Sequence, residues 1–123
     1  MAKIVLADDD KFIRVAYKDG LTRAGHIIDV AEDGEEAIEV VKKVKPDLVL
    51  LDLIMPKLNG FEVLEKLKSD PEVKDIPVVI LTNLSKDTDE NDAKSKGAVT
   101  VLVKSDISLS DLVDYIQQLL VKY

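Results

Sequence analysis

The chain has no cysteine, no tryptophan and only one histidine, His26, among its 123 residues. The absence of cysteine excludes disulfides, thiol catalysis and metals held by thiolates, and a single histidine excludes any site that needs two imidazoles. The longest apolar runs fall far short of the roughly 20 residues that cross a bilayer. Asp8 follows the first apolar residues too soon for a signal peptide. These absences predict a soluble, cytoplasmic protein without membrane insertion.

The charge balance is acidic, because 24 acidic residues outnumber 17 basic ones and give a formal net charge of −7. Such a charge provides no general attraction to nucleic acid or to an anionic membrane surface. Hydrophobic residues make up 46% of the chain and charged residues 33%, a composition typical of folded rather than disordered proteins. The length is that of one ordinary domain, so we expect a single domain over residues 1–123.

Short apolar runs alternate strictly with segments of helical spacing. The runs predict strands over residues 4–7, 26–30, 48–51, 78–81 and 99–103. The other segments predict helices over residues 11–24, 33–45, 58–67, 86–96 and 109–120. This alternation is typical of an α/β fold, a doubly wound parallel sheet with right-handed crossovers. The most polar run, the second, is placed at an edge and the two most apolar runs inside, which gives the strand order 2-1-3-4-5.

The helices differ in how clearly they are marked. Asp10 is predicted to cap the first helix, and Asp33, with Glu36 three residues later, is predicted to cap the second. The fourth has Ala93 as the only apolar residue between positions 85 and 96. Helices in proteins are stabilised mostly by packing an apolar face. We therefore expect the fourth helix to be the least protected, with an ordinary solvated helix as the alternative.

Acidic residues end the two strands that flank the expected switch point. In open α/β sheets, sites form beyond the carboxyl ends of the strands where the strand order reverses, here between the first and third strands. The first strand is followed by Asp8, Asp9 and Asp10, and the third by Asp52. Crowded carboxylates raise one another's pKa unless a cation compensates. An all-oxygen site without histidine or cysteine suits Mg²⁺.

The ends of the fourth and fifth strands supply complementary groups. Thr82 offers a hydroxyl and Lys104 an ammonium. We expect Lys104 to bind Asp52 at rest and a phosphoryl oxygen when one is present. With Mg²⁺, these residues form a phosphoryl-transfer constellation in which Asp52 is the nucleophile and becomes an aspartyl phosphate. Each residue alone also has a structural explanation, and the coincidence at four strand ends is what favours a site.

Four blocks of sequence resemble one known family. Residues 5–10 contain an acidic pair, residues 50–60 contain the pattern D-x-x-M-P-x-x-x-G, and residues 76–82 and 97–104 end in the threonine and the lysine. Together they resemble the receiver domain of two-component response regulators, over essentially the whole chain. In size the chain is similar to the stand-alone, CheY-like regulators. The resemblance implies a flavodoxin-like (CheY-like) fold and a phosphoacceptor that assists its own phosphorylation and dephosphorylation rather than an enzyme.

The resemblance also implies roles by position. Asp52 would take a phosphoryl group from a phosphohistidine of a histidine kinase or histidine phosphotransfer protein. Asp9 and Asp52 would hold Mg²⁺ with the backbone carbonyl of Ile54, and Asp8 would act largely through water. The threonine and lysine at the last two strand ends would contact the phosphoryl oxygens. The surface formed by the fourth helix, fifth strand and fifth helix would then change and control a protein target.

Several positions depart from the family pattern. Asn83 stands where a small residue is common, and Val101 where an aromatic switch residue often sits. Ser105 replaces the usual proline after the lysine, which implies either a trans peptide with a shifted loop or a strained cis peptide. Ile54 and Leu84 are apolar at positions that tune phosphoryl loss, so we hypothesise slow self-dephosphorylation.

These departures leave alternatives open. The first is a pseudo-receiver, which would act as a phosphorylation-independent protein-interaction module. A flavin carrier is disfavoured by the acidic loop after the first strand and by only five aromatic residues. A carboxylate phosphatase usually has a second carboxylate where this chain has Ile54. We expect no output domain in this sequence, so output would pass through a protein partner, from a monomer or a phosphorylation-dependent dimer.

Overall fold

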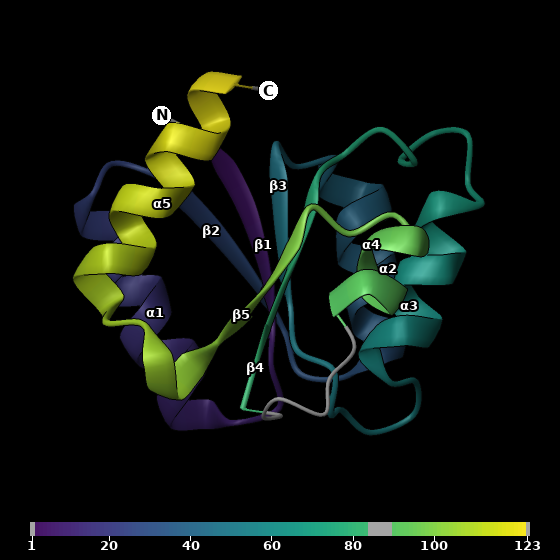
Figure 1. The fold of residues 1–123 in the computed structure, drawn as a ribbon, viewed down its shortest axis with the longest axis horizontal. Helices are drawn as coiled ribbons and strands as arrows, with labels where there is room; N and C mark the ends of the chain where they lie inside the picture. The colour runs from purple at the N-terminus through teal and green to yellow at the C-terminus, as the bar shows by residue number, and fades with distance from the viewer. Residues whose placement is uncertain (1, 84–89, 123) are drawn as a thin grey trace.

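The computed structural model describes residues 2–83 and 90–122 and shows one parallel sheet with helices on both faces (Figure 1). The strands are β1 (Lys3–Ala7), β2 (Ile27–Ala31), β3 (Leu48–Leu51), β4 (Val78–Thr82) and β5 (Thr100–Val103). The helices are α1 (Lys11–Arg23), α2 (Gly34–Val44), α3 (Gly60–Lys68), α4 (Glu90–Ser95) and α5 (Leu109–Lys122). The order β2-β1-β3-β4-β5 confirms the predicted fold class and topology.

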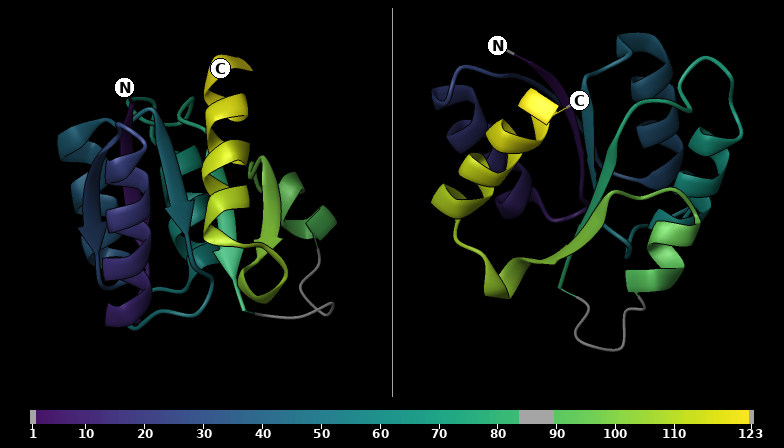
Figure 2. Two further views of the ribbon diagram at one scale, coloured as in Figure 1. Left: turned by 90° about the vertical axis from the view of Figure 1, so that its left-hand side faces the viewer. Right: turned by 45° about the horizontal axis from the view of Figure 1, so that its top comes forward.

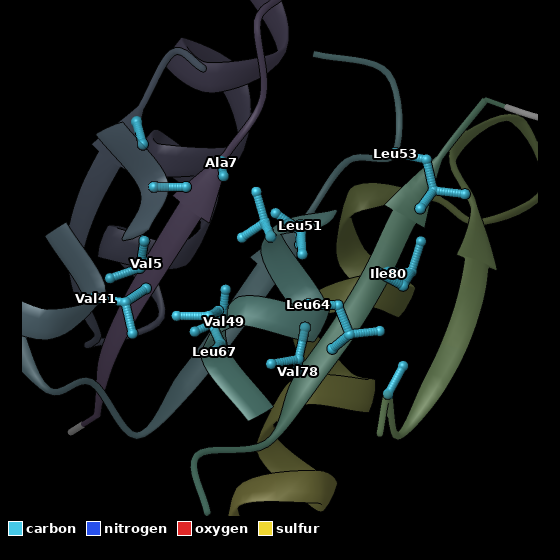
Figure 3. Packing of buried hydrophobic residues seen from close by; sticks show 14 of the residues in the cluster. Val5, Ala7, Val41, Val49, Leu51, Leu53, Leu64, Leu67, Val78 and Ile80 are labelled. Carbon is cyan, nitrogen blue, oxygen red and sulfur yellow. The ribbon is translucent and has the colours of Figure 1, made fainter. Parts of the chain in front are cut away.

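The sheet separates two helical layers and two hydrophobic clusters. Helices α1 and α5 cover one face, and α2, α3 and α4 cover the other (Figures 1 and 2). Side chains alternate along each strand, so Val5 and Val49 pack toward α2 and α3 (Figure 3), whereas Leu6 and Leu50 pack toward α1 and α5. Because both faces are covered, β3 is apolar at every position, and β1 and β4 are apolar except at Lys3 and Thr82.

The strand register brings the carboxyl ends of the strands to one edge of the sheet. Ala7 of β1 lies opposite Leu51 of β3, and Leu51 lies opposite Ile80 of β4. Thr82 at the end of β4 lies opposite Val103 at the end of β5. The residues that follow these positions therefore meet at the edge drawn lowest in Figure 1, while both chain ends lie at the opposite edge.

Carboxylate caps fix where α1 and α2 begin. Asp10 accepts hydrogen bonds from the backbone N–H groups of residues 12 and 13, and Asp33 accepts one from the N–H of Glu36. Both predicted N-caps are thus confirmed. The Glu36 carboxylate, however, accepts from the N–H of Glu32 rather than from Asp33, so the reciprocal half of the expected capping box is displaced by one residue.

Several elements differ from the sequence prediction, mostly by one or two residues at their ends. Helix α3 begins at Gly60 rather than at Leu58, because Asn59 and Glu62 form a complete capping box there. A short 3-10 helix, η1 (Lys104–Asp106), follows β5 and was not predicted. In the fourth helix, the structure describes Glu90–Ser95; the predicted residues 86–89 lie outside the described residues. Within the described part of the chain, no helix has the length and apolar character needed to cross a bilayer.

Candidate functional site

Three carboxylates cluster at the carboxyl edge of the sheet. Asp8 and Asp9 follow β1, Asp52 follows the neighbouring β3, and one oxygen from each lies within 4.8 Å of the others. Asp8 and Asp52 are buried, whereas Asp9 is exposed to solvent. Oxygen-only ligands on a partly solvated edge are the donors that Mg²⁺ prefers, so this set fits that ion. Asp10 lies outside the cluster and caps α1 instead.

Backbone hydrogen bonds continue the sheet beyond the strand ends and hold the backbone of Asp8 and Asp52 in place. The N–H of Asp8 donates to the carbonyl of Ala31 at 3.1 Å, and the N–H of Asp52 donates to the carbonyl of Ala7 at 3.0 Å. Arg14 of α1 donates from its guanidinium to the Asp8 carbonyl at 2.8 Å. The sequence analysis did not identify Arg14, and its contact holds the β1–α1 turn against the helix.

Lys104 connects the two buried carboxylates. Its Nζ donates to Asp52 Oδ2 at 3.0 Å and makes a second hydrogen bond to Asp8 Oδ2. The Lys104 side chain is only 6% exposed. The predicted contact between Lys104 and Asp52 is therefore confirmed, and Asp8 is an additional partner that was not predicted. One ammonium thus compensates two buried negative charges.

Burial and charge shift the pKa values within this cluster. Burial raises the pKa of the Asp8 carboxyl, and the hydrogen bond from Lys104 offsets this only in part. Burial also opposes the charged form of Lys104, but its hydrogen bond to Asp8 and the charge of Asp52 outweigh that effect and raise the Lys104 pKa. The lysine therefore remains an ammonium at neutral pH and stays available to anionic oxygens.

A small cavity of about 190 Å³ opens over the cluster. Thr82 lines it from the end of β4 and is fully buried, so the predicted residue lies at the carboxylates' cavity. Ile54 and Asn83 also line the cavity. Ile54 is 58% exposed, and its backbone N–H donates to Asp52 Oδ1 at 3.4 Å. Leu84, the other apolar position noted in the sequence, lies outside the described residues.

The structure also shows the surroundings of the other positions that depart from the family pattern. The peptide between Lys104 and Ser105 is trans, as are all described peptides, which agrees with the first of the two expected conformations. Val101 is partly buried against the cluster that faces α2 and α3. His26 is buried just before β2, at the edge of the sheet opposite the carboxylates. It is therefore remote from Asp52.

The fold and the acidic edge define the class of protein, and comparison with known sequences agrees. The model of the response regulator receiver domain matches residues 4–117, and the chain belongs to that family. Domains of this family act in phosphorylation-based signalling by two-component systems.

The relatives include proteins of similar length and much longer proteins. The chain is 36% identical over 104 residues to protein PilH of Pseudomonas aeruginosa, covering 85% of this chain and 86% of PilH. It is 39% identical over 118 residues to a gliding motility regulatory protein of Myxococcus xanthus, covering 95% of this chain but only 15% of that protein. Among solved structures, the chemotaxis protein CheY4 of Vibrio cholerae is similar, with a TM-score of 0.87, 30% identity and coverage of 96% and 98% of the two chains.

Proposed function

We propose that this chain accepts a phosphoryl group on Asp52 from a phosphohistidine of a histidine kinase or histidine phosphotransfer protein. The observation that carries the proposal is the cluster of three carboxylates bridged by the buried ammonium of Lys104. Its own histidine, His26, lies at the opposite edge of the sheet, which supports a donor on another protein. The proposed ligands of Mg²⁺ are Asp8, Asp9, Asp52 and the backbone carbonyl of Ile54.

The transfer is a displacement at phosphorus. An Asp52 carboxylate oxygen forms the new P–O bond as the P–N bond of the phosphohistidine breaks, and the imidazole leaves with the electron pair and takes up a proton. Bound Mg²⁺ would neutralise charge on the phosphoryl oxygens. Lys104 exchanges its hydrogen bond to Asp52 for one to a phosphoryl oxygen, and Thr82 donates its hydroxyl to another. Catalysis of this kind is positioning and charge compensation.

We further propose that the readout is a change of the surface formed by α4, β5 and α5. Lys104 begins the turn between β5 and α5, so movement of its ammonium toward a phosphoryl group is transmitted to both elements. The described part of helix α4 contributes a single buried apolar residue, Ala93. Displacing this helix therefore costs little free energy of packing. The proposed target is a protein that binds this surface, either on a monomer or through a phosphorylation-dependent dimer.

Intact-mass measurement tests the phosphoacceptor. The protein is incubated with Mg²⁺ and acetyl phosphate beside the variant Asp52→Asn, which keeps the shape of the side chain and removes its nucleophilic charge. We expect the mass of one phosphoryl group to appear only with Mg²⁺ and only in the wild type. The adduct should then decay slowly, over hours rather than seconds, because the exposed Ile54 side chain at the cavity hinders water.

Two other outcomes redirect the proposal. Mg²⁺ binding without phosphorylation would indicate that Asn83 and Ile54 exclude the small donor, and a phosphohistidine protein then becomes the deciding donor. If neither Mg²⁺ nor a phosphoryl group binds, the phosphoacceptor proposal is wrong, and the chain is a pseudo-receiver that binds its partners without phosphorylation.

A further inference from the structure

We infer that the N-terminus of α2, at Gly34, positions the loop that follows the phosphoacceptor. This loop, residues 53–59, joins Asp52 to the start of α3 and contains Ile54. The inference deepens the proposed function, on which its consequence for Mg²⁺ rests. The contacts between Gly34 and the loop do not depend on that function.

Gly34 contacts the loop backbone directly. Its N–H donates to the Pro56 carbonyl at 3.3 Å. A Cβ atom on Gly34 would lie 2.2 Å from the Leu58 carbonyl oxygen and 2.5 Å from Leu58 Cβ. Real Cβ atoms do not approach other atoms so closely, and the nearest obstacle is backbone rather than a flexible side-chain end. Glycine is thus needed here for close approach of the two segments.

The opposite end of the loop is held against the acidic cluster. The N–H of Gly60 donates to the Leu53 carbonyl at 2.9 Å. A Cβ atom on Gly60 would lie 2.4 Å from the carbonyl oxygen of Asp52 itself. The loop therefore lies between two glycine contacts, one with the start of α2 and one with the start of α3. A displacement at Leu58 can therefore be passed through Gly60 to the backbone of Asp52.

Ion pairs strengthen the contact between α2 and the loop. Lys57 has a left-handed backbone, with φ of 70°, which is unfavourable for residues other than glycine. Its Nζ lies 3.6 Å from Asp33, the N-cap of α2, and 3.9 Å from Glu35 in the first turn. Both carboxylates thus attract the lysine from the same helix end. The start of α2 therefore holds the loop by ion pairs as well as by the Gly34 contacts.

The substitution Gly34→Ala distinguishes two possible roles of this residue. Gly34 could position the loop after Asp52, or it could serve only as the first residue of α2. The backbone of Gly34 is outside the left-handed region, and alanine is the better helix former. If Gly34 served only α2, alanine would leave the loop and the acidic cluster unchanged. If Gly34 positions the loop, the added methyl group must push Leu58 away and shift the backbone of Ile54.

The matched control is Gly20→Ala in α1. A Cβ atom there would lie 2.7 Å from a methyl carbon of Leu109 in α5, so the added methyl group is crowded by a movable side chain and is directed away from the loop. Backbone amide NMR signals are compared without metal, Mg²⁺ affinity is measured by calorimetry, and unfolding is followed separately. A merely structural role changes unfolding but not the signals of the loop or the metal affinity of the folded protein.

We expect Gly34→Ala to displace the amide signals of residues 52–55, 57 and 58 and to weaken Mg²⁺ binding by about tenfold or more, as loss of a supporting contact to a metal ligand does. Gly20→Ala should change neither. Displacements confined to α2, with wild-type Mg²⁺ affinity, would overturn the inference. If wild-type protein binds no Mg²⁺, the proposed function is what fails, and the metal-free amide signals alone decide the inference.

A second variant covers the case in which Gly34→Ala does not fold. Lys57→Gly keeps the left-handed backbone accessible and removes both ion pairs to α2. We expect it to displace the amide signals of residues 53–55, 57 and 58 and to weaken Mg²⁺ binding severalfold. Unchanged signals and affinity in a folded Lys57→Gly variant would contradict positioning by α2.

Discussion

Lys104 acts within the protein as a substitute for a bound cation. Its ammonium compensates Asp8 and Asp52, whose side chains are almost completely buried. A cation that binds the same carboxylates must therefore compete with this internal ion pair. The competition can be measured, because removing the lysine should lower the stability of the metal-free protein and tighten Mg²⁺ binding.

For the variant Lys104→Met we predict lower stability without metal and tighter Mg²⁺ binding than in the wild type. Removing one partner of a buried ion pair costs about 3 kcal/mol at the lower end of the usual range, the appropriate end because Asp9 leaves the cluster open to water. Denaturant unfolding measures the first effect and calorimetry the second. The matched control is Lys42→Met, whose exposed pair with Asp70 should contribute at most about 1 kcal/mol. Weaker Mg²⁺ binding by Lys104→Met would contradict the competition.

His26 makes the stability of the protein sensitive to mild acid. Burial lowers the pKa of its imidazole below the ordinary value of 6.5. Its Nδ1 accepts a hydrogen bond from the N–H of Ala2 at 3.3 Å, and its buried Nε2 has no partner among the described residues. The folded protein therefore favours the neutral ring, while the unfolded chain protonates at the ordinary pKa.

We predict that the free energy of unfolding falls as the pH is lowered from 6.5 to the depressed pKa of folded His26, because only the unfolded chain takes up a proton in that window. Above pH 6.5 this contribution is constant. Urea unfolding as a function of pH measures the slope, and His26→Gln, which does not titrate, isolates it from the carboxylates. Since the chain has one histidine, its NMR titration is unambiguous. A folded-state pKa at or above 6.5 would refute the prediction.

At the scale of elements, α4 and α5 differ sharply in how they are held. Helix α5 buries Leu112, Ile116 and Leu119 against the sheet. The described part of α4 buries Ala93, and just beyond it Lys96 lies 5.5 Å from the centre of the Phe61 ring of α3. A cation over an exposed aromatic ring contributes about 0.5–1 kcal/mol, far less than the packing of three aliphatic side chains.

We therefore predict that amides in α4 exchange with solvent faster than those in α5, by about tenfold for each 1.4 kcal/mol of difference in the free energy of local opening. Hydrogen exchange followed by mass spectrometry or NMR measures this directly. Phe61→Leu removes the ring and should speed exchange in α4 without affecting α5, which serves as the internal control. Equal protection of both helices would refute the prediction.

The helices and strands could be predicted where a repeating or short-range sequence pattern marks them. The buried strands appear as apolar runs, and Asp10 and Asp33 are recognisable caps. The start of α3 was placed two residues early because Leu58 fits the helical spacing, although the capping residues Asn59 and Glu62 were visible in the sequence. The 3-10 turn η1 is three residues long and has no side-chain cap, so no periodic signal marks it.

At the scale of the whole molecule, binding at the acidic edge is linked to folding. Because Asp8, Asp9 and Asp52 come together only in the folded sheet, Mg²⁺ should bind the folded state preferentially. We predict a stabilisation of about 2.7 kcal/mol at a Mg²⁺ concentration one hundred times the dissociation constant. Thermal or urea unfolding with and without Mg²⁺ measures it. Asp9→Asn should abolish the effect without lowering metal-free stability, since Asp9 is exposed; stabilisation that persists in Asp9→Asn would place the metal elsewhere.

The site could be predicted as far as topology determines it. Strand order alone brings Asp8 and Asp52 to one edge, and the ends of β4 and β5 bring Thr82 and Lys104 there. The contact between Lys104 and Asp8 depends on the course of η1. The Arg14 contact depends on a side-chain rotamer, and the Gly34 contact depends on how closely the start of α2 packs against the loop after Asp52. None of these follows from spacing along the chain.

Both ends of the described chain lie far from the acidic edge. Ala2 and Val121 line one surface cavity together with His26. Figure 1 shows both chain ends beside the amino ends of the strands. A reporter protein, an affinity handle or a surface tether attached at either end would therefore leave the carboxylates accessible to a large donor. Single-molecule assays and fluorescent fusions can use either terminus, and a short connector at one end would hold a neighbouring domain close to the other.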